Sequence, residues 1–328
     1  MAVRVGVIGV GRMGANHVRC LSEMPEAELL AVADPNLERA EELADRFGCR
    51  SYSNHHAMLM EERPDAVVLA VPTPLHTQFA CDVIEAGCHL LVEKPLAESR
   101  AEALAIIQAA RQKEVRLAVG HVERFNPAVR KLREIIADGD LGRVLSVSAR
   151  RVGLPSPHYR ETNVIVDLAV HDLDVIRYLL GEPLRMLSSV TGRLTGGPSE
   201  DYADMLLVSG TIPCVIQVNW VTPVKIRTLC VVGDAGYAEL NYITQTIELY
   251  RRQDIASPAN YAELIAQYSE PERKTIVGGG EEPLKAELRS FFEAIHTGCD
   301  PEASGEDGLA AVELAEAALE YARHVQPL

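Results

Sequence analysis

The sequence that decides the fold is Val3-Arg4-Val5-Gly6-Val7-Ile8-Gly9-Val10-Gly11-Arg12-Met13-Gly14. The β-branched run Val3–Ile8 predicts a strand, and the helical stretch Met13–Met24 overlaps the end of the glycine motif. A GxGxxG pattern between a strand and a helix predicts a dinucleotide-binding turn. In such a turn Gly9 permits the sharp bend, Gly11 lets the backbone approach a pyrophosphate, and Gly14 lets the helix pack on the strand.

An acidic residue completes this pattern. A second apolar run, Leu29–Ala33, ends at Asp34, twenty residues after Gly14. A carboxylate at this place hydrogen-bonds a ribose diol and repels a 2′-phosphate, which favours NAD over NADP. The helix that opens at Arg12 and Met13 supplies N–H groups and a partial positive charge for the phosphates. The alternative is a plain glycine turn with a solvent-facing Asp34, but strand, turn, helix and acid in register favour the NAD site.

The first 120 residues alternate between strands and helices. Further strands are predicted at Ala66–Val71, His89–Glu93 and Leu117–Val119, and further helices at Leu37–Phe47, His76–Ala86 and Arg100–Lys113. Strands that alternate with helices predict a doubly wound parallel sheet with helices on both faces. We therefore expect an α/β fold whose N-terminal Rossmann domain covers residues 1–122.

Ligands of such sheets bind beyond the carboxyl ends of the strands. Five further cofactor-binding candidates follow the predicted strands there: Thr73, Pro74, His76, Glu93 and Lys94. Pro95 disfavours a helical conformation at Lys94, so this lysine is expected at the strand tip. Repulsion from a cationic nicotinamide ring would suit Lys94 for proton transfer. The alternative is a surface lysine paired with Glu93.

The pattern changes after His121. Helices are predicted at Pro127–Ala137, Asn163–Leu180, Pro283–His296 and Gly308–Val325, and Ser257–Gly280 is expected to be a loop. Strands are predicted at Met186–Thr195, Asp204–Val208, Val215–Val221, Arg227–Val232, Tyr237–Asn241 and Thr246–Tyr250. Strands without intervening helices predict an open, mainly antiparallel sheet. Residues 123–328 are therefore expected to form a C-terminal α+β domain for substrate binding and oligomerisation.

Asp167 and His171 lie four residues apart on the predicted helix Asn163–Leu180, so they share a face. A carboxylate one turn from an imidazole suits the oxidation of an alcohol, because the His accepts the hydroxyl proton while the Asp orients it or a neighbouring hydroxyl. Two alternatives are a plain helix-surface pair and half of a metal site. Since no further His or Cys pair at ligand spacing supports a metal, we expect none.

The composition narrows the class of protein. The chain has 328 residues with a formal net charge of −15, which argues against nucleic acid or an anionic membrane as a partner. Seven cysteines without a CxxC pair indicate buried thiols in a reducing cytoplasm. The uncharged stretch Met205–Val224 is long enough to span a membrane, but its Gly, Pro and Asn residues favour two strands around a turn. We expect a soluble, cytoplasmic protein.

Taken together, these motifs resemble the Gfo/Idh/MocA oxidoreductase family over nearly the whole chain. The markers are Gly9–Gly14, Glu93-Lys94-Pro95, Gly120-His121 with Arg124-Phe125 and Pro127, Asp167 with His171-Asp172, Glu282-Pro283-Leu284 with Glu287-Leu288 and Phe291, and Ser304–Gly308. The resemblance implies hydride transfer between a sugar alcohol and NAD, and a homodimer or homotetramer built through the C-terminal sheet. It also implies that Lys94 is the active-site lysine, His171 the proton acceptor and Asp167 its helper at the substrate.

One departure from the family pattern points to a branch. Many members carry glycines around the Asp, whereas this chain reads Asn163-Val164-Ile165-Val166-Asp167-Leu168-Ala169-Val170-His171. With Ala149–Gly153 upstream, it looks most like the branch that oxidises C3 of UDP-N-acetylglucosamine; a related branch oxidises the corresponding uronic acid. Arg150, Arg151 and Arg160 would suit a diphosphate, or else form a surface charge cluster. Arg124 and Asn163 are further substrate candidates.

Two other functions remain open on the sequence. An inositol or free-sugar dehydrogenase of the same family would keep the fold and mechanism. A non-catalytic sensor of a dinucleotide or sugar would keep the fold alone, and the presence of Lys94, Asp167 and His171 argues against it.

Overall fold

The computed structural model of the chain describes residues 2–155, 162–252, 260–261 and 273–323. The chain folds into two units, each of which packs mainly within itself. The first unit comprises Met1–Phe125 and Glu281–Glu316, and the second comprises Asn126–Gly280 and Ala317–Leu328.

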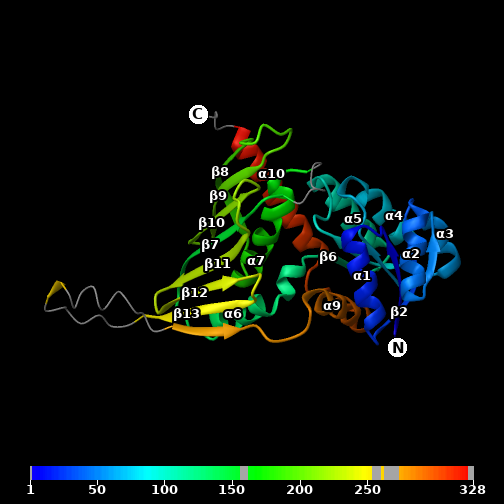
Figure 1. The fold of residues 1–328 in the computed structure, drawn as a ribbon, viewed down its shortest axis with the longest axis horizontal. Coiled ribbons are helices and arrows are strands. Elements are labelled where there is room, and N and C mark those ends of the chain that lie inside the picture. Colours follow the sequence, from blue (N-terminus) through cyan, green and yellow to red (C-terminus); the bar gives the residue numbers. More distant parts are fainter. Residues whose placement is uncertain (1, 156–161, 253–259, 262–272, 324–328) are drawn as a thin grey trace. The chain divides into compact units, whose positions relative to one another are not determined.

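The first unit is built on a six-stranded parallel sheet. Its strands stand in the order β3-β2-β1-β4-β5-β6 (Figure 1). Their bounds are β1 Val3–Ile8, β2 Ala27–Ala33, β3 Arg50–Tyr52, β4 Ala66–Leu69, β5 His89–Glu93 and β6 Leu117–Gly120. The strand order reverses between β1 and β4, and sheets of this kind bind ligands at that point, outside the carboxyl ends of the strands. The predicted Rossmann fold is confirmed.

Five α-helices alternate with these strands. They are α1 Arg12–Glu23, α2 Leu37–Phe47, α3 His55–Glu62, α4 His76–Glu85 and α5 Arg100–Gln112, with the short 3-10 helices η1 Thr73–Leu75 and η2 Val122–Phe125. Asn36, Asn54 and Ser99 cap the N-termini of α2, α3 and α5 by accepting backbone N–H groups. β3 and α3 are absent from the predicted elements, because a three-residue strand and an eight-residue helix are too short to give a recognisable period.

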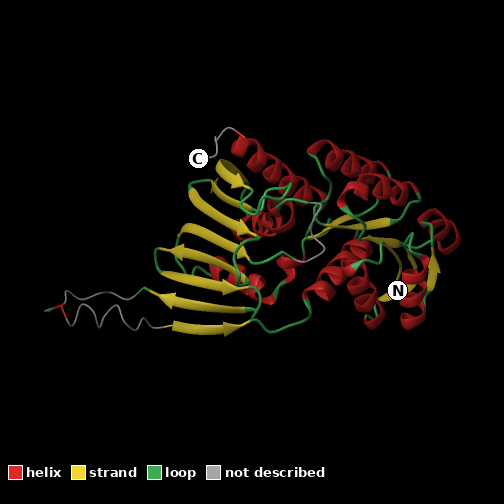
Figure 2. Cartoon of the chain, turned by 45° about the horizontal axis from the view of Figure 1, so that its top comes forward, coloured by secondary structure: helices red, strands yellow, loops and turns green. Residues whose placement is uncertain are grey.

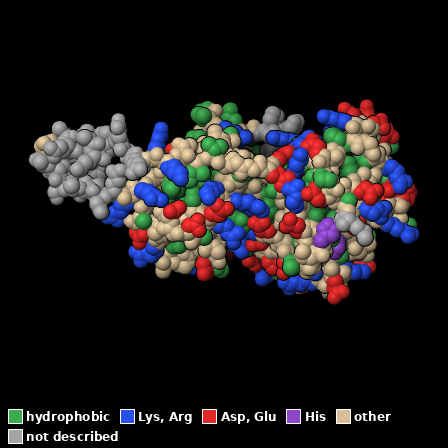
Figure 3. Space-filling view, turned by 90° about the horizontal axis from the view of Figure 1, so that it is seen from below, with side chains coloured by type: hydrophobic (Ala, Val, Ile, Leu, Met, Phe, Trp, Pro, Cys, Tyr) green, Lys and Arg blue, Asp and Glu red, His purple; other side chains and the backbone are tan. Residues whose placement is uncertain are grey.

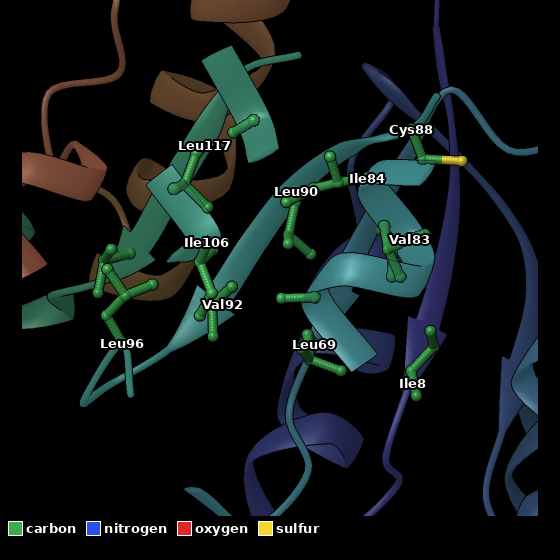
Figure 4. Packing of buried hydrophobic residues seen from close by; sticks show 14 of the residues in the cluster. Ile8, Leu69, Val83, Ile84, Cys88, Leu90, Val92, Leu96, Ile106 and Leu117 are labelled. Atoms are coloured by element: carbon green, nitrogen blue, oxygen red, sulfur yellow. The ribbon is translucent and has the colours of Figure 1, made fainter. Parts of the chain in front are cut away.

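The sheet is covered on both faces, so its strands are almost wholly apolar. Figure 4 shows side chains of β4 and β5 packed against those of α4 and α5, including Leu69, Leu90, Val83 and Ile106. A separate cluster on the other face contains Val5, Leu21 and Phe291. Burial of these side chains fixes the strand ends, and hence the residues that follow them.

The C-terminal helix α9, Pro283–Thr297, returns to the first unit. Leu284, Leu288, Phe291 and Phe292 of α9 are buried in the same cluster as the apolar face of α1. The following helix α10, Gly305–Arg323, also begins in this unit, where Ser304 bridges to Ala118. The sequence predicts two domains that are each one continuous segment, 1–122 and 123–328. In the structure each compact unit consists of two segments, because the apolar face of α9 packs on the N-terminal part of the chain.

The second unit contains an eight-stranded sheet in the order β14-β13-β12-β11-β7-β10-β9-β8. The bounds are β7 Val144–Val152, β8 Leu184–Gly192, β9 Tyr202–Ser209, β10 Ile212–Asn219, β11 Ile226–Gly233, β12 Gly236–Asn241, β13 Thr246–Arg251 and β14 Arg273–Val277. Only β7 and β10 pair in parallel, so the described sheet is mixed and mostly antiparallel, as expected. The uncharged stretch Met205–Val224 contains most of the hairpin β9–β10, so two strands around a turn lie there as predicted.

Two helices pack on one face of this sheet, as Figures 1 and 2 show. They are α6, Pro127–Ala137, and α7, Val170–Leu180, which ends at Gly181 in the left-handed conformation. The residues before α7, Ile165–Ala169, form a π-helix rather than the regular helix predicted over Asn163–Leu180. The opposite face of the sheet carries none of the described helices, and its side chains alternate with the buried ones along each strand.

The structure corrects two other expectations. β7 was not predicted, although it lies at the centre of the sheet between β10 and β11. β14 falls within Ser257–Gly280, which was expected to be a loop. Its residues are exposed or half-buried, so no apolar alternation marks it, and backbone pairing with β13 holds it in place.

The seven cysteines all lie among the described residues and are free. Cys20, Cys88 and Cys214 are buried as expected, whereas Cys299 is exposed and the other three are half-buried. Burial raises the pKa of Cys88 and of Cys214 to about 11, so these thiols are poor nucleophiles at neutral pH. Among the described residues, no helix combines the length and apolar character needed to cross a membrane.

Candidate active site

The glycine-rich turn connects β1 to α1. Gly9 has φ +88°, and a Cβ there would lie 2.6 Å from the carbonyl oxygen of Ala70. A Cβ on Gly14 would lie 1.8 Å from the carbonyl oxygen of Gly9, so only glycine lets the helix approach the turn. A Cβ on Gly11, in contrast, would meet nothing within 4 Å. The protein itself therefore does not exclude a side chain at Gly11, and open space lies beside this backbone.

The N-terminus of α1 has the features of a phosphate site. Gly11 is its N-cap and makes no side-chain capping bond, and the first turn, which includes Arg12 and Met13, contains no acidic residue. No carboxylate in the helix's own first turn therefore neutralises these N–H groups and their partial positive charge. The residues present fit the pyrophosphate of a dinucleotide.

Asp34 lies just beyond β2 and beside the turn. Its Oδ2 accepts the N–H of Val10 at 2.9 Å, and its Oδ1 accepts the N–H of Asn36 at 2.9 Å. Each carboxylate oxygen has a second lone pair, so these two bonds orient the carboxylate and leave acceptor capacity for a ribose diol. Asp34 therefore also holds the glycine turn, which the sequence did not predict.

Glu93 and Lys94 occupy the end of β5. Glu93 is 8% exposed, its Oε1 accepts from Nε2 of His17 at 2.7 Å, and its Oε2 accepts the N–H of Lys94 at 3.3 Å. Burial alone would raise the pKa of Glu93, but the bond from His17 and the charges of His17 and Lys94 lower it below its usual value. Glu93 thus fixes the Lys94 backbone to α1, and Lys94 itself is half-buried.

His76 has a similar role at the neighbouring strand. It is 1% exposed, and its ring nitrogens lie 2.9 Å from the carbonyl oxygens of Pro95 and Val71. Burial lowers its pKa. The contacts tie the turn after β4 to the segment after Lys94, whose peptide bond to Pro95 is cis. Thr73 and Pro74 are more accessible than His76 and lie in η1 of this turn.

Asn163, Asp167 and His171 lie on the π-helix and α7 of the second unit. The Asn163 side-chain oxygen accepts the N–H groups of Ile165 and Val166 at 3.0 Å, so Asn163 caps the π-helix. Asp167 lies within the π-helix and is 8% exposed, while His171 is half-buried in the first turn of α7. Single π-turns inside helices occur frequently at functional sites, since they re-aim a few side chains at a cost in helix stability.

Arg150 and Arg151 occupy adjacent positions on β7, so they point to opposite faces of the sheet. Arg151 is 4% exposed and donates from Nε and Nη2 to Asp172 of α7, at 2.7 and 3.1 Å. Its guanidinium also lies 4.6 Å from the centre of the Tyr242 ring. Arg150 is exposed on the other face. The structure therefore does not bring these two arginines together, and the contacts of Arg151 favour a structural role over contact with a diphosphate. Arg160, the third candidate, lies outside the described residues.

Arg124 is 4% exposed in η2 of the first unit. Its Nη2 lies 2.8 Å from Oδ1 of Asp307, and its Nη1 donates to Oδ2 of Asp307 and to the carbonyl of Glu302. Burial alone would raise the pKa of Asp307, but the hydrogen bond and charge of Arg124 lower it from 3.8 to about 2. These contacts also favour a structural role for Arg124, which joins η2 to the start of α10.

Replacing Arg124 by methionine should lower the free energy of unfolding by about 3 kcal/mol at pH 7, because the half-buried carboxylate of Asp307 loses its charged partner. The folded pKa of Asp307 lies below its unfolded value, so the stability it contributes is present above about pH 4. That contribution, about 2 kcal/mol, is lost as the pH falls through about 2. Denaturant unfolding at pH 7 and at pH 3 measures both effects.

Arg116→Met is the matched control, because Arg116 makes an exposed 3.4 Å pair with Asp300. Its cost should be less than about 1 kcal/mol at either pH. Equal losses in the two variants, or a cost of Arg124→Met that is the same at pH 3 as at pH 7, would contradict a buried structural pair.

Sequence reasoning missed the partners that hold the candidates in place. His17 lies three residues after Gly14 on α1, a spacing that puts both on the face toward the sheet, and this was a usable signal. The carboxylates of Asp172 and Asp307 carried no such signal, because their pairing with Arg151 and Arg124 depends on the tertiary fold.

Two family profiles match the chain. The profile of the oxidoreductase family with an NAD-binding Rossmann fold, Gfo/Idh/MocA, matches residues 3–121. The profile of the Gfo/Idh/MocA C-terminal domain matches residues 129–239.

Individual relatives agree with these profiles. UDP-N-acetylglucosamine 3-dehydrogenase from Acidithiobacillus ferrooxidans is 32% identical over 251 residues, which is 76% of this chain and 77% of that protein. Inositol 2-dehydrogenase from Rhizobium meliloti is 28% identical over 97% of this chain and 96% of its own length. A solved structure of the Acidithiobacillus ferrooxidans enzyme superposes with a TM-score of 0.85 at 26% identity, covering 99% of this chain and 100% of that chain.

The glycine turn, the sheet order and both profiles lead to the same conclusion. The chain belongs to the Gfo/Idh/MocA family and is an NAD-binding oxidoreductase.

Proposed function

We propose that this protein oxidises a secondary alcohol of a sugar nucleotide, at C3 of UDP-N-acetylglucosamine or its uronic acid. The observation that carries the proposal is the similarity to UDP-N-acetylglucosamine 3-dehydrogenase, 32% in sequence and 0.85 in TM-score over 99% of the chain. The product would be a 3-keto sugar nucleotide. NAD, when bound, accepts the hydride.

Three residues carry the chemistry in this proposal. His171 accepts the proton of the C3 hydroxyl, for which a half-buried imidazole in the first turn of α7 is suited. Asp167 orients His171 or holds an adjacent hydroxyl. Lys94 hydrogen-bonds the reacting oxygen and stabilises the negative charge that develops on it. The His17–Glu93 pair positions the Lys94 backbone.

The cofactor contacts are also proposals. Gly9, Gly11 and Gly14 allow the pyrophosphate to approach α1, Arg12 and Met13 provide the first N–H groups of the helix, and Asp34 accepts from the adenosine ribose. Thr73 and Pro74 follow the strand next to β1, at the switch point of the sheet. For Glu93 and His76, both cofactor candidates on the sequence, we propose that they support this edge of the sheet, because each is buried and bonded within the protein.

A second candidate substrate is myo-inositol or a free sugar. The match to inositol 2-dehydrogenase covers 97% of the chain, which is more than the match to the sugar-nucleotide enzyme in sequence. The arginines expected to meet a diphosphate do not decide between the two, because Arg151 is paired internally and Arg150 lies on the other face of the sheet. A sensor without catalysis is the third candidate.

Formation of NADH at 340 nm tests these candidates side by side. Purified protein with NAD is offered UDP-N-acetylglucosamine, UDP-N-acetylglucosaminuronic acid, myo-inositol and glucose, each with and without 2-oxoglutarate to reoxidise a retained cofactor. The proposal expects turnover with a UDP-sugar only. Turnover with inositol or glucose alone would overturn the proposed substrate, and NAD binding without any turnover would favour the sensor.

We further propose that a second copy of the chain covers the open face of the sheet in the second unit. Val190, Leu206, Val215 and Val232 are 38–46% exposed on the strands of this sheet, and Val215 pairs directly with Leu206. Charges of both signs lie on the same face: Arg150, Asp204 and Glu239. A two-fold axis brings one patch against its own copy, so such a patch complements itself.

Leu206→Glu should therefore shift the mass in solution from a dimer or tetramer to a smaller species, measured by light scattering after size exclusion. A buried, unpaired carboxylate on each side of a symmetric interface weakens association strongly. Met60, 77% exposed on α3, is the control site, and Met60→Glu should leave the mass unchanged. A wild-type monomer, or an unaffected Leu206→Glu oligomer, would contradict the interface.

We also propose that the protein works in the cytoplasm. Its seven cysteines are free, which is usual in a reducing compartment. Figure 3 shows acidic and basic side chains interspersed over one face of the molecule, whereas a nucleic-acid-binding face would concentrate basic side chains.

A further inference from the structure

A cluster of potential metal ligands lies in the first unit, apart from the residues assigned to catalysis and NAD binding. His55 and His56 begin α3, and Asp82 lies on α4. One ligand atom from each of the three residues lies within 4.8 Å of the other two. The sequence predicted no metal site, because two of these ligands are adjacent in the chain and the third follows 26 residues later.

The distances within the cluster suit a small tetrahedral ion. Nε2 of His55 lies 2.9 Å from Oδ2 of Asp82, and Nε2 of His56 lies 3.5 Å from the same oxygen. Two ligand atoms at zinc–ligand distances of about 2.0–2.1 Å, in tetrahedral geometry, lie roughly 3.4 Å apart. These two separations lie on both sides of that value, and the ligand atoms of all three residues lie within 4.8 Å of one another, so a zinc ion would draw the side chains together by about 1 Å or less.

The side chains are held in place before any ion binds. The ring of His55 stacks on Phe79 of α4 with centroids 4.3 Å apart, and its other neighbour is the His56 ring at 4.0 Å. The Asn54 side chain accepts the N–H groups of His56 and Ala57, which fixes the backbone that carries both imidazoles. Such preorganisation lowers the entropy lost when ligands converge on an ion.

The solvent exposure of the cluster and the types of its ligand atoms indicate which ion it would bind. The side chains of His55, Asp82 and His56 are 11%, 27% and 58% exposed, so the site opens to solvent on the side of His56. Two imidazoles and one carboxylate suit zinc, whereas magnesium and calcium prefer sites made of oxygen atoms alone. Water can fill the remaining coordination position.

We propose that His55, His56 and Asp82 bind one zinc ion, which joins the start of α3 to α4. A Nε2–H of His55 now bonds to Asp82, so zinc would replace that hydrogen, and each imidazole would carry its hydrogen on Nδ1. The ion would fasten the segment that follows the edge strand β3. This proposal does not depend on the substrate of the enzyme.

Calorimetric titration of the full chain with zinc chloride tests the proposal, after treatment with a chelator and its removal. We expect one zinc ion per chain, at least 10-fold weaker binding in His55→Gln and in Asp82→Asn, and no binding of magnesium in the same assay. Glu85→Gln is the matched control on α4, because Glu85 pairs with Lys113 instead. His296→Asn, at the end of α9, is the control for an unrelated histidine.

A second measurement keeps the result clear if a variant folds poorly. Zinc should raise the melting temperature of the wild type and of both controls, but not that of the two ligand variants, since an ion that binds only the folded state stabilises it. NADH binding, measured without zinc, shows whether each variant is folded. Absence of zinc binding in the wild type, or equal affinity in the ligand variants and the controls, would overturn the proposal.

Discussion

Replacement of His171 by asparagine should lower kcat by about 10²–10⁴, the range contributed by a general base. The side chain stays polar and close in size, and Asp167 and the π-helix remain, so the substrate site should keep its shape. NAD affinity should match that of the wild type, because the substitution leaves the glycine turn and Asp34 of the first unit unchanged, and a thermal melt shows whether the variant is folded. Steady-state kinetics and NADH fluorescence measure these quantities.

Lys94→Met is the companion variant, and it should also lower kcat. Its loss of kcat should be accompanied by a smaller change in KM, since the bond from Lys94 strengthens as charge develops on the reacting oxygen. Glu85→Gln, which alters an exposed ion pair on α4, serves as the control and should keep wild-type kcat. Near-normal turnover in His171→Asn or Lys94→Met would remove the role assigned to that residue.

Gly14→Ala and Gly11→Ala should both weaken NAD binding, but only Gly14→Ala should lower the melting temperature. At Gly14 the added Cβ would lie 1.8 Å from a backbone oxygen, so α1 must separate from the turn, and we expect a lower melting temperature and loss of NAD binding. At Gly11 the Cβ meets nothing within 4 Å, and φ is −63°, which alanine adopts freely. This variant should fold with an unchanged melting temperature.

Gly11→Ala should nevertheless bind NAD at least 10-fold more weakly, because its methyl group occupies the space through which the pyrophosphate reaches the backbone. Titration of intrinsic or NADH fluorescence measures the affinity, and a thermal melt measures the fold. Wild-type affinity in Gly11→Ala would place the pyrophosphate elsewhere. A stable Gly14→Ala that binds NAD normally would contradict the packing of turn and helix.

The first unit was largely predictable from the sequence because each of its signals is local. The run Val3–Ile8, the glycines after it and Asp34 each fix a short piece of structure, and their order fixes the sheet. The strand β3 was not predicted, because Arg50–Tyr52 is too short to show an alternation of apolar and polar residues. The packing of α9 on the first unit was not predicted, because the sequence of an apolar helix face does not show which other element it contacts.

The second unit and the roles of charged residues were less predictable. β7 carries Arg150 and Arg151. Their side chains lie on opposite faces of the sheet because they are neighbours in a strand, and the sequence did not predict this strand. On the sequence Arg124 and Arg151 are only substrate candidates, because an isolated arginine does not reveal its carboxylate partner. The π-helix at Ile165–Ala169 contains ordinary helix-compatible residues, so the sequence predicted a regular helix.

Transfer of deuterium from the substrate tests the central claim most directly. UDP-N-acetylglucosamine carrying deuterium at C3 is incubated with the protein and NAD, and the NADH formed is analysed by mass spectrometry. The account predicts one deuterium in the nicotinamide ring and slower turnover than with unlabelled substrate. NADH without deuterium, or turnover restricted to myo-inositol, would contradict oxidation at C3 of a sugar nucleotide.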